Sequence, residues 1–303
     1  MNFDFYNQLV QITDEKRVYK EEPMKKHTTF RVGGNADYFV MPQNVSEIKA
    51  IIELCKEEDI PYYILGNGSN LLVSDAGYRG VIIQIYKEMN QIEVVGECLK
   101  VQAGALLSRV GTVALENELA GFEFAAGIPG TVGGAVVMNA GAYGGEMKDI
   151  IVNATVLTQE GEILTLNKEE LELGYRTSVI AKKGYIVLAA EYQLQKGEKE
   201  AIRARMDELK TQRVTKQPLE YPSAGSTFKR PEGYFAGKLI QDAGLRGFQV
   251  GGAQVSEKHC GFVINKDQAT AADIKELMRQ VAEKVMQEFG VELEAEVKTL
   301  GDF

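Results

Sequence analysis

The chain has 303 residues, of which 45% are hydrophobic and 25% charged, as in a globular protein with a sizeable core and room for two domains. Its formal net charge of −9 argues against nucleic acid or an anionic membrane as the main partner. The N-terminus has no basic start followed by an apolar core, and no apolar run approaches the ~18 residues of a membrane span. We therefore expect a cytoplasmic protein.

Cysteine and histidine are scarce. Cys55, Cys98 and Cys260 lie far apart and form no CxxC pair, which fits reduced thiols in a cytosol. The histidines are His27 and His259, and the second is adjacent to Cys260, which suits two ligands of one metal ion poorly. We expect no metal site, and so little histidine also disfavours a Ser-His-Asp hydrolase.

The N-terminal pattern predicts a helical face over residues 5–12, a strand near 18–24 and then a βαβ unit. Its strands are residues 36–41 and 61–65. Asn44 and Glu47 resemble a capping box before the connecting helix, in which Ile48 begins an apolar i, i+3, i+4, i+7 pattern.

The second strand runs into the loop Gly66-Asn67-Gly68-Ser69-Asn70. Asn-Gly is a strong hairpin signal, but consecutive backbone N–H groups in such a loop also form a nest for a phosphate. Leu71 stands where a Rossmann fingerprint needs its third glycine, and no Gly-Lys-Ser/Thr of a P-loop follows. The loop alone is weak evidence for a cofactor.

A glycine-rich stretch at 121–145, GFEFAAGIPGTVGGAVVMNAGAYGG, contains eight glycines interleaved with apolar residues. Glycine is favourable where the backbone takes positive φ or approaches another group closely. We interpret the stretch as a cradle for a large, flat cofactor. The alternative is a tight strand corner in which the glycines serve packing.

Short strands are predicted at 81–85, 92–95, 99–103, 153–158, 162–166 and 185–194, with a helix at 107–119, so this part is α+β rather than doubly wound. A helix at 198–214 leads to predicted strands at 248–256 and 261–265. A further helix opens at Thr270, and a last strand covers 291–300. In that strand Glu292, Glu294 and Glu296 share one face, which favours a solvated acidic surface.

Five motifs carry a family resemblance: LGNGSNLL at 65–72, AAGIPGTVGGAVVMNAGAYGGE at 125–146, GYRTS at 174–178, YPSAGSTFKRP at 221–231 and ELEAEVKTLG at 292–301. In this order they resemble the UDP-N-acetylenolpyruvoylglucosamine reductase family over nearly the whole chain. Only 50 residues separate Arg176 from Ser226, so the chain resembles the family's shorter (type II) variant.

The resemblance implies a vanillyl-alcohol-oxidase/PCMH-type FAD-binding domain at 1–200, with lobes of about 1–65 and 66–200. A smaller α/β substrate-binding domain follows at 201–303. The implied reaction is the NADPH-dependent reduction, through noncovalent FAD, of the enolpyruvyl group of UDP-N-acetylglucosamine enolpyruvate to the lactyl ether UDP-N-acetylmuramate. This is a cytoplasmic step of peptidoglycan precursor synthesis. NADPH and the UDP-sugar are expected to share one cleft on a monomer.

The resemblance also assigns site residues. Arg176 offers a planar cation for the substrate carboxylate, Ser226 a proton, and Glu296 a carboxyl group that acts protonated or through a hydrogen bond. The residues expected to bind substrate are Tyr175, Arg213, Lys229 and Arg230. The residues expected to bind FAD are Arg31, Gly66, Asn67, Gly68, Ser69, Asn70, Gly127, Ile128, Pro129, Gly130, Gly133, Gly134, Ala135, Asn139, Ala140 and Gly141.

Two alternatives remain open. One is an FAD-dependent carbohydrate or hydroxy-acid oxidase of the same fold. Many such oxidases attach the flavin covalently to His or Cys, and neither glycine-rich loop contains one. The other is a catalytically silent nucleotide-sugar-binding protein, and Arg176, Ser226 and Glu296 at all three family positions weigh against it.

Overall fold

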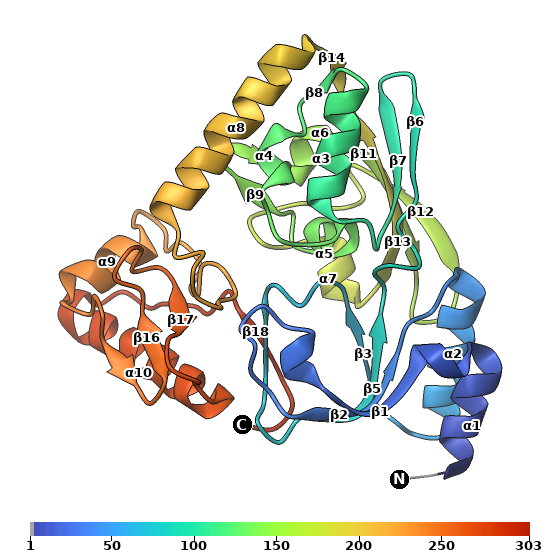
Figure 1. Ribbon diagram of the computed structural model, residues 1–303, viewed down its shortest axis with the longest axis horizontal. Helices are drawn as coiled ribbons and strands as arrows, with labels where there is room; N and C mark the ends of the chain where they lie inside the picture. The colour runs from blue at the N-terminus through green and yellow to red at the C-terminus, as the bar shows by residue number, and fades with distance from the viewer. Residues whose placement is uncertain (1–2) are drawn as a thin grey trace. The chain divides into compact units, whose positions relative to one another are not determined.

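The computed structural model describes residues 3–303, which divide into two compact units (Figure 1). The first comprises the chain up to Tyr19, Phe39–Asn67 and Ile82–Arg213; the second comprises Lys20–Tyr38, Gly68–Val81 and Val214–Phe303. The chain thus enters the second unit three times. The linear division near residue 200 expected from the sequence stays a prediction.

The N-terminal elements contain the predicted helices and strands. They are α1 (Phe3–Ile12), β1 (Val18–Pro23), β2 (Asn35–Val40), α2 (Val45–Glu57), β3 (Tyr62–Leu65) and β5 (Tyr78–Gln84), with 3-10 turns at Glu15–Arg17 and Met24–Lys26. The N-terminus of α2 is capped as predicted, because the Asn44 side chain accepts a hydrogen bond from Glu47 N at 2.9 Å. The sheet order is β1-β2-β5-β3, so β5 lies between the two strands of the predicted βαβ unit.

The first unit is built on a five-stranded sheet ordered β12-β11-β13-β7-β6. Its strands are β6 (Ile92–Val95), β7 (Cys98–Gln102), β11 (Ile151–Leu157), β12 (Ile163–Asn167) and β13 (Ile186–Gln193). The neighbours in this sheet pair antiparallel, and Figure 1 shows β6 and β7 as a long hairpin at its edge. The predicted strand positions here are confirmed.

Short strands and helices of varied length complete this unit. They are α3 (Leu107–Glu116), β8 (Leu119–Ala120), α4 (Glu123–Ala126), α5 (Val132–Val137), β9 (Gly141–Ala142), β10 (Gly145–Glu146), α6 (Met147–Ile150), α7 (Val179–Lys183), β14 (Gln195–Lys196) and α8 (Lys199–Lys216). Helix α5, inside the glycine-rich stretch, packs on β7 and β13. The stretch is therefore seated on the sheet.

The second unit centres on the antiparallel sheet β15-β16-β17, against which α10 packs. Its elements are β4 (Leu71–Val73), α9 (Ala236–Asp242), β15 (Gln249–Val250), β16 (Ala253–Val255), β17 (Val263–Asn265), α10 (Ala271–Phe289) and β18 (Lys298–Leu300). Strands β4 and β18 pair in parallel. Helix α10 opens with the predicted cap at Thr270, whose side chain accepts from Asp273 N.

Two predictions for this unit are wrong. The single strand expected over 248–256 is a hairpin that reverses at Gly251, where φ is +53° and a Cβ would lie 2.2 Å from Oδ1 of Asp273. Two consecutive glycines permit this reversal. The strand expected over 291–300 is regular only at Lys298–Leu300, and Ala295 forms an isolated bridge to Phe228.

Across residues 3–303, no helix is both long and apolar enough to cross a membrane.

Candidate functional site

The two glycine-rich segments meet in the first unit. A Cβ at Gly66 would lie 2.4 Å from Oγ1 of Thr131, a buried residue at the start of α5. The carbonyl of Gly66 accepts a hydrogen bond from Gln84 Nε2 at 3.1 Å. The loop that follows β3 and the glycine-rich stretch are thus neighbours, and glycine at 66 is needed for their approach.

Other glycines of the stretch are not explained by contacts within the chain. At Gly134, which is exposed on α5, the nearest atom to a Cβ would be Thr131 Oγ1 at 3.8 Å. At exposed Gly127 a Cβ would meet Cδ of Arg213 at 3.7 Å, an ordinary contact. Glycine inside a helix costs about 1 kcal/mol relative to alanine. Close approach of a flat cofactor to this backbone would explain why glycine is present despite that cost. The glycine-rich stretch therefore fits FAD.

Gly68 has an internal role instead. Its φ is +62°, and a Cβ there would lie 2.0 Å from the carbonyl oxygen of His27 within the second unit. Asn70 of the same loop donates from Nδ2 to the carbonyl of Glu296 at 3.1 Å. The loop at 66–70 is therefore anchored at both ends by the chain itself.

Arg176 occupies a tight turn. Gly174 and Thr177 bridge each other across it, and Arg176 has a φ of +55°. Its guanidinium carbon lies 5.1 Å from the centroid of the Tyr175 ring, which is half exposed. This packing holds the cation beside an aromatic face.

Arg213 lies beside the glycine-rich stretch. Its side chain approaches the Cβ position of Gly127, and burial lowers the pKa of its guanidinium, partly opposed by the phenol of Tyr143. Because a guanidinium is strongly basic, the group stays cationic at neutral pH. Among the basic residues expected to bind substrate, Arg213 thus lies next to the flavin cradle.

Ser226 is exposed on a turn and is followed by a buried, hydrogen-bonded residue, Thr227. Gly225 before it has a φ of +77°. Thr227 after it donates from its backbone N–H to Gly261 O at 2.8 Å and accepts at Oγ1 from Val263 N at 2.9 Å. These bonds tie the turn to β17 and fix where the Ser226 hydroxyl emerges.

Glu296 departs from its predicted face. The alternation expected over 291–300 places it with Glu292 and Glu294, and those two are more exposed, but Glu296 is only 9% exposed. Its N–H donates to Thr227 O at 2.9 Å. The structure thus brings Glu296 next to the Ser226 turn.

Three further basic residues expected at the site, Lys229, Arg230 and Arg31, belong to the second unit. Lys229 donates from its backbone to Glu294 O at 2.8 Å and pairs through its ammonium with that carboxylate. Exposed Arg230 stacks on Phe235 with its guanidinium carbon 3.9 Å from the ring centroid. Arg31, also exposed, has a φ of +57°.

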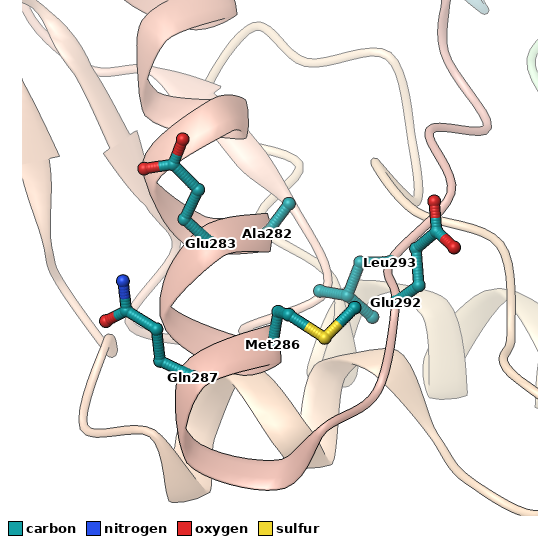
Figure 2. A pocket seen from close by; sticks show the side chains of 6 residues that line it. All are labelled: Ala282, Glu283, Met286, Gln287, Glu292 and Leu293. Carbon is teal, nitrogen blue, oxygen red and sulfur yellow. The ribbon is translucent and has the colours of Figure 1, made fainter.

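A hollow between the end of α10 and the following segment contains none of these residues (Figure 2). It is lined by Ala282, Glu283, Met286, Gln287, Glu292 and Leu293. Figure 2 shows Met286 extending toward Leu293, with Glu283 projecting from α10 and Glu292 from the segment that follows it. Two carboxylates disfavour an anionic substrate here. In the part of the chain that is described, no group of three His, Cys, Asp or Glu could hold a metal ion.

Sequence reasoning missed the internal use of Asn139. Its side chain is buried, donates from Nδ2 to Glu146 Oε2 at 2.8 Å and to Gly174 O at 3.0 Å, and accepts at Oδ1 from Lys148 N at 2.9 Å. Both amide hydrogens and the amide oxygen are therefore used within the chain. Its φ of +44° suits asparagine, but nothing in the sequence identifies the distant partner Gly174.

Two regions of the chain match known protein families. Residues 36–167 match the model of an FAD binding domain, and residues 217–300 match that of the UDP-N-acetylenolpyruvoylglucosamine reductase C-terminal domain. A protein of that name from Agathobacter rectalis is 55% identical over 315 residues, covering 100% of both chains.

Solved structures point the same way. The UDP-N-acetylenolpyruvylglucosamine reductase of Thermus caldophilus superposes with a TM-score of 0.80 at 37% identity, over 94% of this chain and 98% of that one. p-Cresol methylhydroxylase reaches a TM-score of 0.50 at 16% identity, over 64% of this chain and 43% of its own. That likeness concerns the fold alone, and the predicted vanillyl-alcohol-oxidase/PCMH-type architecture is confirmed. The chain therefore belongs to the family of UDP-N-acetylenolpyruvoylglucosamine reductases, as an FAD-dependent oxidoreductase that uses NADPH to reduce the enolpyruvyl group of its UDP-sugar substrate.

Proposed function

We propose that Arg176, Ser226 and Glu296 perform the reduction in this chain, acting on one substrate. The observation that carries the proposal is the burial of Glu296 and its backbone hydrogen bond to Thr227, the residue after Ser226. A carboxyl group taken out of solvent beside an exposed serine is unusual for a surface segment. A reaction at Ser226 would explain why the Glu296 carboxyl group is buried beside it.

When bound, FAD would supply the reducing equivalents for the enolpyruvyl group, with NADPH as their source. Arg176 binds the substrate carboxylate through its planar guanidinium and offsets the negative charge that builds on the neighbouring carbon. Ser226 donates the proton of its hydroxyl to that carbon. Glu296, in its protonated form or as a hydrogen-bond partner, holds the substrate and the proton path without adding an opposing charge.

The UDP end is assigned to Arg213, Lys229 and Arg230, with Tyr175 against the sugar. Three cations suit a diphosphate. We further propose that NADPH and the UDP-sugar bind alternately rather than together, that the chain acts as a monomer, and that it works in the cytoplasm.

The two half-reactions provide the test. Ser226→Ala should leave the anaerobic bleaching of FAD by NADPH near its normal rate, because that step delivers no proton to a substrate carbon. Reoxidation by the enolpyruvyl substrate should slow by ~10²-fold or more, the effect of losing a positioned general acid. Stopped-flow absorbance of both halves measures this, with Ser223→Ala, in the same segment, as the control. Equal slowing of both halves would show that Ser226 shapes the flavin site instead.

A further inference from the structure

Two buried side chains connect the glycine-rich stretch to the turn that carries Arg176. The Asn139 side chain is 1% exposed and donates from Nδ2 to Gly174 O at 3.0 Å. Ser178 is 0% exposed and donates from Oγ to Val137 O at 2.7 Å. The two bonds fall on either side of Arg176 in the sequence, and both reach the same three-residue segment, 137–139.

The turn between these bonds needs support. Gly174 N donates to Thr177 O at 3.1 Å and Thr177 N to Gly174 O at 3.4 Å, so only a narrow bridge closes it. The φ of +55° at Arg176 lies in the left-handed region, which costs a residue with a side chain roughly 1–2 kcal/mol. Such a conformation persists where the surrounding structure holds it in place.

Ser178 has a second role that is purely structural. Its Oγ accepts from Ala181 N at 3.1 Å and so caps α7. Replacing it would weaken both the cap and the connection to Val137. Asn139 separates these effects better, because each of its hydrogens has a different acceptor.

The second hydrogen of Asn139 goes to Glu146, whose carboxylate also contacts Lys148 Nζ at 3.0 Å. Hydrogen bonding to Lys148, aided by Asn139, lowers the pKa of the Glu146 carboxyl, so it is an anion at neutral pH. Asn139 therefore bridges a fixed anion and a backbone carbonyl, and only an amide of this length supplies both donors here.

We propose that Asn139 is a positioning residue for Arg176: its amide clamps the turn at 174–178 to the end of the glycine-rich stretch. The guanidinium is thereby held in register with the backbone that binds FAD. The inference rests on the proposed role of Arg176. A catalytic cation must be placed within about 0.5 Å, and misplacement by about 1 Å costs on the order of 10²-fold in rate.

The test is Asn139→Asp. Aspartate keeps the size, the acceptor for Lys148 N and the tolerance of positive φ, but it replaces both donors with an acceptor. FAD content and the rate of FAD reduction by NADPH are measured in the same variant, so that any effect on the cofactor site is separated from the effect on Arg176. Reoxidation by the enolpyruvyl substrate should slow by roughly 10- to 100-fold. The loss should shrink as pH falls, because the introduced carboxyl regains one donor when it is protonated.

A double variant distinguishes positioning from stability. In Asn139→Asp/Glu146→Gln the new amide at 146 can donate to the carboxylate at 139, which restores that pair, whereas Gly174 O still lacks the hydrogen bond from residue 139. We expect thermal stability to recover while reoxidation stays slow. Recovery of both together would overturn the proposal. Asn153→Asp is the matched control, since it removes an amide that donates to Glu191 at 3.1 Å on β11; it should cost stability without slowing reoxidation selectively.

Hydrogen exchange gives a readout that does not depend on activity. Asn139→Asp should speed exchange at the Thr177 amide, while Asn153→Asp should not; unchanged exchange at Thr177 refutes the clamp. Combining Asn139→Asp with Arg176→Lys should slow reoxidation less than the product of the two single effects, and fully multiplicative effects refute positioning. If Arg176→Lys alone is silent while exchange at Thr177 is faster, the proposed function fails and the clamp does not.

Discussion

The backbone N–H of Glu296 donates to the carbonyl of Thr227 at 2.9 Å, so two segments distant in sequence place a buried carboxyl and an exposed serine together. The isolated bridge between Phe228 and Ala295 continues this pairing. Since this hydrogen bond is formed by backbone atoms, it does not depend on the side chain of Ser226 or of Glu296. Side-chain substitutions at Ser226 and Glu296 therefore remove no atom of this backbone hydrogen bond.

Variants at Glu296 should show whether its charge matters. If the carboxyl acts protonated or as a hydrogen-bond partner, Glu296→Gln should slow reoxidation by the enolpyruvyl substrate less than about 10-fold, because size and polarity are kept. Glu296→Asp, one methylene shorter, should slow it by ~10²-fold, since the group no longer reaches. Single-turnover kinetics measure both, with Glu292→Gln as the control. A glutamine variant slower than the aspartate variant would mean that ionised carboxylate is required.

The glycines of the cradle should separate into two classes. Gly134→Ala adds a methyl where the chain leaves room and favours helix α5, so the stability of the flavin-free protein should stay level or rise by up to about 1 kcal/mol. Its affinity for FAD should fall at least ~10-fold, because the methyl occupies the cofactor's side. Gly66→Ala, whose Cβ would press on Thr131 Oγ1, should lower the melting temperature itself. Calorimetry and flavin titration give the two readouts.

Unchanged FAD affinity in Gly134→Ala would show that the cofactor does not lie against α5. If the flavin-free variant were less stable and its affinity for FAD were unaffected, the glycine at 134 would instead be required for packing within the chain.

The sequence predicted correctly those helices and strands in which the regularly spaced apolar residues are also the buried ones. Helix α10 keeps its apolar stripe, with Ile274, Leu277, Val281 and Val285 all buried, and the pair β11–β12 turns where Gly161 stands. The family, its cofactor and its reaction followed from motifs rather than from pattern. Those motifs are specific because they span the chain in order.

The remainder depended on contacts that local pattern cannot contain. Glu296 lies in an irregular segment that forms an isolated bridge at Ala295 instead of a continuous strand, so the period-2 alternation breaks there and its side chain is buried. The partner of Asn139 is a backbone carbonyl 35 residues away, and a carbonyl looks the same at every position in a sequence. Both features are determined by tertiary contacts, which override the local conformational preference of the sequence.

The flavin should be released intact by acid or heat. Neither glycine-rich loop contains His or Cys, but the backbone of His27 lies directly against Gly68, and its ring Nε2 is 2.9 Å from Glu22 Oε1. That ion pair or hydrogen bond occupies the ring nitrogen, so we expect all the flavin absorbance in the supernatant after precipitation. Yellow colour left in the pellet, and lost in His27→Ala, would instead identify a covalent bond to His27.

Acid sensitivity should trace in part to His259. Burial lowers the pKa of its imidazole below the ordinary value of 6.5, and Gly261 N donates to its Nδ1 at 3.1 Å, which requires that nitrogen to be unprotonated. The folded chain thus favours neutral His259, and the unfolded chain binds a proton more readily. Stability from this residue is present above about pH 6.5 and is lost as pH falls through and below that value.

His259→Asn tests this assignment. Asparagine places an oxygen where Nδ1 accepts from Gly261 N, and it does not titrate in this range. We expect the melting temperature of the wild type to fall more steeply between about pH 7 and pH 5 than that of the variant. One proton limits the difference in slope to about 1.4 kcal/mol per pH unit, and the partial exposure of the ring reduces it further. Because His27 is the only other histidine, His27→Asn shows the contribution of a histidine outside this loop. Parallel profiles for wild type and His259→Asn would place the acid sensitivity in the carboxylates instead.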